Sequence, residues 1–262
     1  MDKNKLLVPG AIVIAGIVIA GAVFMSNSKK AATSAATASS HPDIVLQAVS
    51  PTDHILGSAD ASVVMVEFSD LGCPFCNQFH GIVHQIFDKY GKDNSFAWVF
   101  RQYPIPELHP NAPKMAAASE CVAEQGGNDA FWKFVDEVYA ETPLDKQVDP
   151  AIIPGIAKKL GLDNSKIQEC LTAGKFDAKV ADEAKQGKAA GGSGTPYSIL
   201  VFKNPLSADA LQFVSDTNDA LLQQVRSTKD VFFASKDGKM VAVSGRFPFE
   251  LMDSIISELI KK

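Results

Sequence analysis

Two of the chain's four cysteines stand in the motif "GCPFC", where Cys73 and Cys76 are separated by Pro74 and Phe75. Cysteine pairs at this spacing serve three kinds of chemistry. They hold a metal ion, they form a structural disulfide, or they exchange a disulfide with other thiols. The residues nearby and the elements that carry the motif distinguish these uses.

A zinc site would require two ligands besides the cysteine pair. His80 and His84 follow Cys76 at four-residue intervals on one face of a predicted helix. We expect that side chains a full turn apart on one straight helix do not converge easily on a tetrahedral ion. Both histidines are therefore interpreted as ordinary, partly exposed helix residues, and no metal site is predicted.

Redox chemistry is the favoured use of the cysteine pair. A purely structural bridge between Cys73 and Cys76 would close almost no loop and would stabilise the fold little. Reversible disulfide exchange does not require the bridge to stabilise the fold. Cys-x-x-Cys pairs are a common signature of such exchange.

The elements around the motif place its two cysteines differently. An apolar, β-branched run, 63–68, predicts a buried strand before the motif. Apolar residues then recur at intervals of three and four up to Tyr90, which predicts an amphipathic helix with Pro74 in its first turn. Cys73 is thus predicted at a helix N-terminus, where unpaired N–H groups and the helix dipole stabilise a thiolate. Cys76 lies one turn further in and is more shielded.

One carboxylate interrupts the predicted strand. Glu67 shares a face with Val63 and Met65, while the residues between them face the other way. A carboxylate in an apolar strand costs free energy unless it has a partner or a function. Glu67 therefore either serves the nearby site or lies at a strand edge, bonded to backbone or water.

The first residues read as a membrane segment rather than as part of the folded domain. Residues 1–25 include the apolar run "LLVPGAIVIAGIVIAGAVFM", which is roughly the 20 residues that span a bilayer core. A transmembrane anchor is favoured over a cleaved signal peptide, whose apolar region is usually shorter. The small, polar residues 26–43 predict a flexible linker.

The net charge of −5 and the scattered lysines argue against a nucleic-acid partner.

Helices are predicted for much of the chain after the motif. Alanine-rich periodicity and breaks at "QGGND", "TPLD", "GLD" and "AGK" indicate helices over 110–125, 129–140, 150–160, 163–173 and 175–189.

Three stretches together resemble the DsbA-like thiol–disulfide oxidoreductases. They read "SPTDHILGSADASVVMVEFSDLGCPFC", "FRQYPIPELHPNAPKMAAASECVAEQGGNDAFWKFVDEVYA" and "GSGTPYSILVF", in this order, between about 47 and 203, and the last helix matches as well. The resemblance implies an α/β thioredoxin fold over 44–262 with an α-helical subdomain inserted at about 104–190. This domain would be preceded by the single transmembrane helix.

The resemblance also implies roles for the residues of the motif. Cys73 would be the attacking and leaving thiolate, Cys76 the resolving thiol, and Glu67 a proton relay for the resolving thiol. Pro74 and Phe75 would tune the thiolate. Many relatives have a histidine where Phe75 stands, so a weaker oxidant is expected here.

The segment "GTPY" resembles the family's strand entrance. Thr195 and Pro196 would form a cis peptide beside the two sulfurs, and the Thr195 backbone would pair with an extended substrate. The alternative is an ordinary turn before a strand. No cofactor is implied.

The other two cysteines, Cys121 and Cys170, indicate the cellular compartment of the domain. In several members of the family a second, non-catalytic disulfide lies in the helical region, and the resemblance thus implies a Cys121–Cys170 bridge. Two separate buried thiols are the alternative. A bridge would require an oxidising compartment, and would place the catalytic domain outside the cytoplasm on a single-pass membrane anchor.

The C-terminal part departs from the family pattern. The segment at about 204–245 adds a predicted helix from Ser207 to about Val225 and a hairpin centred on "KDG". The final helix, "FELMDSIISELIKK", follows.

The predicted function is the transfer of a disulfide to exported proteins. The substrates would be unfolded or partly folded chains with free thiols, and a membrane redox partner would reoxidise the site. The alternatives are a disulfide reductase or isomerase on the same scaffold, or a tethered binding or chaperone module without catalysis.

Overall fold

The computed structural model describes residues 43–225 and 228–260 of the chain. The predicted anchor, 1–25, and nearly all of the predicted linker lie outside these residues. Within the described part, none of the helices is long and apolar enough to span a bilayer. Ile44, the predicted first residue of the domain, is buried.

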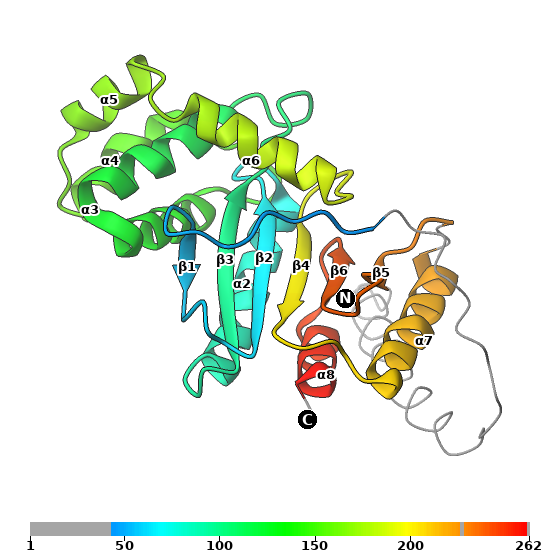
Figure 1. The fold of residues 1–262 in the computed structure, drawn as a ribbon. Coiled ribbons are helices and arrows are strands. Elements are labelled where there is room, and N and C mark those ends of the chain that lie inside the picture. Colours follow the sequence, from blue (N-terminus) through cyan, green and yellow to red (C-terminus); the bar gives the residue numbers. More distant parts are fainter. Residues whose placement is uncertain (1–42, 226–227, 261–262) are drawn as a thin grey trace, which may run out of the picture.

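Six strands form one mixed sheet in the order β1-β3-β2-β4-β6-β5 (Figure 1). Their bounds are β1 (His54–Leu56), β2 (Val63–Ser69), β3 (Phe96–Gln102), β4 (Tyr197–Phe202), β5 (Phe232–Ala234) and β6 (Met240–Ser244). β2 and β3 are parallel, joined by helix α2 (Pro74–Tyr90), whereas β4 runs antiparallel to β2. The motif therefore lies where central strand β2 ends and β4 begins.

The two faces of the sheet have separate cores. Val63 and Met65 of β2 pack with α2 and with α8 (Phe249–Leu259) in the larger core. Val64, Val66 and Phe68 belong to the second core, beneath α6 (Asp177–Ala189). The predicted alternation of β2 side chains is thus confirmed.

The helical insertion between β3 and β4 consists of α3 (Ala112–Glu141), α4 (Ile153–Lys159), α5 (Asn164–Thr172) and α6. A 3-10 turn, Pro150–Ile152, precedes α4. The predicted helices over 110–125 and 129–140 form the single element α3, interrupted at Gly127. Gly127 has φ 73° and ψ −166°, a conformation that only glycine adopts without strain. The predicted break is therefore present as an interruption rather than as a loop.

The added C-terminal segment lies at the far edge of the sheet. Helix α7 (Ala208–Val225) packs against edge strand β5, and Asn218 accepts hydrogen bonds from the backbone N–H groups of Val231 and Phe232. Figure 1 shows α7 on the opposite side of the molecule from α3, α4 and α5. The predicted hairpin is confirmed as β5 and β6. Strands β1 and β3 were not predicted.

Candidate active site

Cys73 occupies the N-cap position of α2, with an extended backbone, and Pro74 begins the helix. The loop that presents it is fixed by Asp70, which follows strand β2. One carboxylate oxygen of Asp70 accepts from the Gly72 N–H at 2.7 Å, and the other accepts from the Ile105 N–H at 2.8 Å. His109 Nδ1 also lies 2.8 Å from this second oxygen. The loop is thus held in place by a buried carboxylate before chemistry begins.

The two thiols of the motif differ in burial. Both are free in this structure; Cys73 is 5% exposed and Cys76 is fully buried. The Cys73 thiol donates to the Thr195 carbonyl oxygen at 3.6 Å, and the Asp70 N–H donates to Cys76 Sγ at 3.5 Å. Cys73 also lines a surface cavity and Cys76 does not, so an incoming thiolate can approach only Cys73.

The environment separates the pKa values of the two thiols. The hydrogen bond from the Cys76 thiol lowers the pKa of Cys73 to about 6. The backbone N–H groups of Cys76 and Phe75 at the start of α2 lower it further, whereas burial acts in the opposite direction. Burial raises the pKa of Cys76 well above its usual range, and the neighbouring Cys73 adds to the increase. One sulfur is thus suited to carry negative charge and the other to carry a proton.

Glu67 lies beneath the motif on central strand β2 and is completely buried. The alternative of a strand-edge position is therefore wrong, because β2 has strands on both sides. Glu67 Oε2 accepts from Trp98 Nε1 at 2.9 Å, while Oε1 has no hydrogen-bond partner. Burial raises the pKa of Glu67 to about 7, although the polar side chains of Ser69 and Trp98 favour the charged form and lower it. A carboxyl with this pKa both gives and takes a proton near neutral pH.

The Thr195–Pro196 peptide is cis and lies beside Cys73. Its position follows from the sheet register, because Tyr197 of β4 pairs with Phe68 near the end of β2. The alternative of an ordinary turn is not what the structure shows. The Thr195 backbone therefore borders the reactive sulfur.

The surface around Cys73 is mostly apolar. A small cavity beside it is lined by Leu71, Pro74, Tyr139 and Leu144, and also by the polar residues Asn77, Thr142 and Lys146. Phe75, inside the motif, is 57% exposed, and Leu144 is 49% exposed. Such a surface suits the apolar side chains that an unfolded polypeptide presents.

Several residues of the site were missed by the sequence reasoning. Tyr139 lies 3.3 Å from the Ser69 hydroxyl and donates to the Asp70 carbonyl oxygen, and Asn77 donates to the carbonyl oxygens at the end of α3. Asp70 carried a usable signal, since an aspartate two residues before a glycine after a strand favours a turn closed by its own side chain. Tyr139 and Trp98 carried none, because they reach the site through the tertiary fold.

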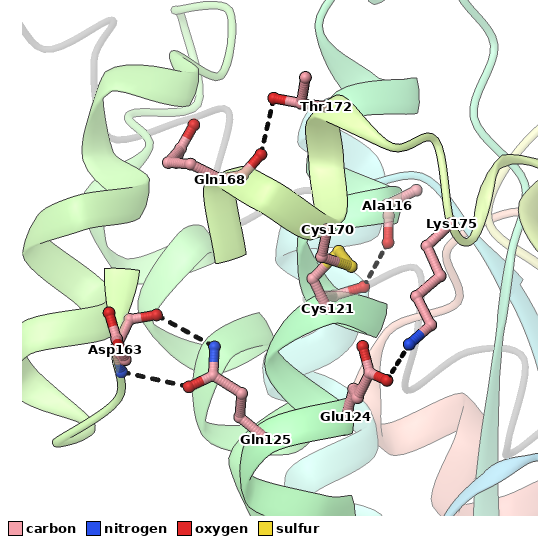
Figure 2. Close-up of a disulfide and its surroundings, with 10 residues drawn as sticks. Ala116, Cys121, Glu124, Gln125, Asp163, Gln168, Cys170, Thr172 and Lys175 are labelled. Atoms are coloured by element: carbon pink, nitrogen blue, oxygen red, sulfur yellow. Dashed lines mark hydrogen bonds and ion pairs between the residues drawn. A yellow bond between two sulfur atoms is a disulfide. The ribbon is translucent and has the colours of Figure 1, made fainter. Parts of the chain in front are cut away.

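Cys121 of α3 and Cys170 of α5 form a disulfide, with Cα atoms 6.0 Å apart. Figure 2 shows the bridge between the two helices, with further contacts nearby. Gln125 and Asp163 exchange two hydrogen bonds, and Lys175 pairs with Glu124. The alternative of two separate thiols is thus not what the structure shows. The bridge and its neighbours fasten the insertion together.

Comparison with known proteins gives one family and two groups of similar proteins. The family model described as thioredoxin matches residues 49–211. Na(+)/H(+) antiporter NhaA 3 of Salinispora tropica is 30% identical over 154 residues, covering 59% of this chain and 22% of that protein. NhaA 1 of Mycolicibacterium vanbaalenii is 36% identical over 96 residues, which are 36% of this chain and 15% of that protein. The chain thus spans about a fifth or less of the length of these curated relatives.

Solved structures of similar fold include proteins named DsbA and BdbD, one of which, α-DsbA2 of Wolbachia pipientis, is described as a thiol–disulfide exchange protein. α-DsbA1 of Wolbachia pipientis has a TM-score of 0.59 at 18% identity, covering 81% of this chain and 92% of that one. DsbA2 of Pseudomonas aeruginosa has a TM-score of 0.54 at 19% identity, with coverages of 80% and 95%. BdbD of Bacillus subtilis has a TM-score of 0.55 at 21% identity, with coverages of 71% and 97%. The thioredoxin fold with a helical insertion is therefore shared with these proteins.

Proposed function

The chain belongs to the thioredoxin family, and from that premise we propose that it is a thiol–disulfide oxidoreductase that introduces disulfides into exported proteins. One observation carries the proposal: Cys73 lies at the N-terminus of α2 beside a surface cavity, whereas Cys76 is fully buried one turn further in, and the pKa values of the two thiols are displaced in opposite directions. This division of roles is what directional disulfide exchange requires, because one sulfur must leave easily as a thiolate.

The proposed reaction starts from the Cys73–Cys76 disulfide. A substrate thiolate attacks Cys73 Sγ, a new bond joins the two sulfurs, and the bond to Cys76 breaks. The electron pair stays on Cys76, which takes a proton because its environment disfavours the thiolate. Glu67 is electrostatically coupled to Cys76 and is the proposed source of that proton. The neutral acid is available near pH 7 because its pKa is about 7.

A second substrate thiolate completes the reaction. It attacks the substrate sulfur of the mixed disulfide, so that the substrate disulfide forms and Cys73 leaves as a thiolate. The lowered pKa of Cys73 makes this departure easy, since thiols of low pKa leave faster. Two electrons then rest on the Cys73–Cys76 pair. A membrane redox partner that accepts them would restore the disulfide.

The substrate is proposed to lie in extended form across the site. The Thr195 backbone borders Cys73 and would bond to the substrate backbone, while Phe75 and Leu144 offer exposed apolar surface. Such contacts depend little on sequence, which suits an enzyme that acts on many unfolded or partly folded chains.

The proposed location is the extracytoplasmic side of a membrane, with the segment 1–25 as a single-pass anchor. The Cys121–Cys170 disulfide supports this location, because such bridges persist in oxidising compartments. The apolar run at the start of the chain supports the anchor.

A redox titration against glutathione buffers tests the direction of exchange. An oxidase requires a Cys73–Cys76 potential well above the roughly −270 mV of thioredoxin. With Phe75 in place of a histidine, a value below the roughly −120 mV of DsbA is expected. A potential at or below that of thioredoxin would contradict the oxidase assignment and favour a reductase. A folded wild-type protein that shows no exchange activity would favour a binding module without catalysis.

A further inference from the structure

Three side chains converge on one point between α2 and α3, away from the cysteine motif. His80 and His84 come from α2 and Asp136 comes from α3. Asp136 Oδ1 lies 2.7 Å from His80 Nε2 and 3.0 Å from His84 Nε2, and the two histidine nitrogens are 3.1 Å apart. All three atoms that meet carry lone pairs able to bind a metal ion.

The expectation that these histidines do not converge is therefore wrong, as is the expectation that both are ordinary, partly exposed residues. Side chains at positions i and i+4 lie one above the other on a helix, so two imidazole rings there can aim at a common point. His80 is buried, and only His84 is partly exposed. The third member comes from a separate element, as a metal site requires.

The distances fit a tetrahedral ion. Zinc binds histidine nitrogen and carboxylate oxygen at about 2.0–2.2 Å, so ligand atoms of a tetrahedral site lie about 3.3–3.5 Å from one another. The three observed separations, 2.7, 3.0 and 3.1 Å, are smaller by about 0.2–0.8 Å. An ion at the centre would thus need only small side-chain shifts to reach ideal bond lengths.

The two rings and the carboxylate share a single point of contact. Both Nε2 atoms lie within hydrogen-bonding distance of the same carboxylate oxygen, and they lie 3.1 Å from each other. If both carried a proton, two N–H groups would compete for that one oxygen. A cation at this point would instead accept a lone pair from each of the three atoms.

The surroundings hold the ligands and leave an approach from solvent. The His80 ring packs between Trp98 and Tyr139, with ring centroids 5.0 and 4.9 Å away. Its side chain is 7% exposed, against 35% for His84 and 45% for Asp136. One ligand is thus fixed by packing, while the other two border the solvent from which an ion and a fourth ligand would come.

We propose that His80, His84 and Asp136 form a binding site for a divalent transition-metal ion, with Zn²⁺ as the favoured ion and water as the fourth ligand. Two imidazoles and one carboxylate suit zinc and its first-row neighbours. Calcium and magnesium prefer sites built from oxygen atoms alone, so they are not expected to bind here. The proposal is independent of the exchange reaction, since it involves neither cysteine of the motif.

The test is a titration of the full-length, tag-free chain in detergent with the Cys73–Cys76 pair oxidised. Oxidation matters because thiolates bind zinc themselves, and the disulfide removes them from competition. Zn²⁺ should bind with one-to-one stoichiometry by calorimetry. Co²⁺ should bind at the same site, give the intense visible absorption of tetrahedral coordination, and be displaced by Zn²⁺. Absence of binding by the oxidised wild-type protein would overturn the proposal.

Matched variants show whether the bound ion lies at these residues. His84→Gln and Asp136→Asn should each weaken Zn²⁺ binding by more than about 100-fold, since even outer-shell changes cost about 10–100-fold. Asp129→Asn removes an exposed carboxylate from the same element, α3, and should leave the affinity unchanged. Equal affinity in wild type, His84→Gln and Asp136→Asn would place the ion elsewhere and overturn the proposal.

Discussion

The two cysteine pairs of this protein show how position in the fold decides what a pair of thiols does. Cys73 and Cys76 lie within one turn at the start of α2, with opposite displacements of their pKa values. Cys121 and Cys170 come from two helices of the insertion and are joined across a separation of 49 residues. The first pair closes almost no loop, so forming or breaking its bond changes the chain entropy little. The second pair restrains a long loop.

The comparison explains why one chain contains both kinds of pair. A catalytic disulfide must open and close without disturbing the fold, and the short spacing of Cys73 and Cys76 satisfies that requirement. A structural disulfide must instead persist, and Cys121 and Cys170 are buried between α3 and α5, where they contribute to one core. Removing Cys73 and Cys76 should therefore abolish exchange and leave stability nearly unchanged. Removing Cys121 and Cys170 should lower stability and leave exchange nearly unchanged.

The largest expected effect is on exchange. Cys73→Ser should reduce disulfide transfer to the uncatalysed background, because no sulfur remains that a substrate can reach. Cys76→Ser cannot form the Cys73–Cys76 disulfide, so it should also lose transfer. Its Cys73 thiolate should instead attack the disulfide of an oxidised, unfolded substrate and accumulate the mixed disulfide, because the Cys76 thiol that would release the substrate is absent. Transfer to a reduced, unfolded substrate measures the first loss, and non-reducing gels with the oxidised substrate measure the trapped species. If Cys73→Ser traps substrates and Cys76→Ser does not, the roles are reversed.

The next effect is on stability. The double variant Cys121→Ala/Cys170→Ala should lose about 2–4 kcal/mol of unfolding free energy. For a chain of this size, that corresponds to a decrease in Tm of roughly 4–16 °C, measured by thermal unfolding. Exchange at Cys73 should remain nearly normal.

The control for this variant is Cys73→Ser/Cys76→Ser, which should keep nearly the wild-type Tm. A large loss of exchange in the alanine variant would contradict the separation of the two pairs. An unchanged Tm would contradict the stabilising role of the Cys121–Cys170 bridge.

A smaller effect concerns the pH dependence contributed by Glu67. Its pKa is about 7 in the folded protein, whereas its ordinary value is 4.5. Between these two pH values the carboxyl group is protonated in the folded state and ionised in the unfolded state. Stability should therefore fall as pH rises from about 4.5 to 7, by about 3 kcal/mol from this group. The Glu67→Gln side chain does not titrate. The free energy of unfolding of this variant, relative to that of the wild type, should therefore rise as pH increases from about 4.5 to 7. Urea unfolding at a series of pH values measures the difference.

The exchange rate supplies a second measurement on the same variant. Glu67→Gln should slow disulfide transfer and alter its pH profile while the fold remains intact, because the proposed proton source for Cys76 is gone. The same profile in wild type and variant would exclude Glu67 from proton transfer.

The smallest expected effect is the titration of Cys73 itself. In the reduced protein, thiolate absorbance near 240 nm should appear with a midpoint at about pH 6. Cys76→Ala should shift the midpoint upward, because the hydrogen bond from Cys76 is the largest cause of the lowered pKa. Cys121→Ala/Cys170→Ala should leave it in place. A midpoint near that of an ordinary thiol would remove the electrostatic difference between the two pairs.

Much of the site was predictable because its parts are neighbours in the chain. The apolar alternation of β2, the apolar spacing of α2 and Pro74 at its start together place Cys73 at a helix N-terminus. The same alternation placed Glu67 on the face of Val63 and Met65, and the structure shows that α2 covers this face. The pairing of Cys121 with Cys170 and the cis bond at Pro196 came from resemblance to a family. No spacing in the chain specifies either one.

What the sequence by itself determined was therefore the local geometry: which residues form a strand or a helix, and where a side chain lies along it. Only the tertiary structure decided which distant groups meet, such as Trp98 with Glu67, the Thr195 carbonyl with Cys73, and Asp136 with the two histidines. The physical reason is that hydrogen bonds and steric preferences between near neighbours act within a few residues. Strand order and helix packing depend on contacts summed over the whole core.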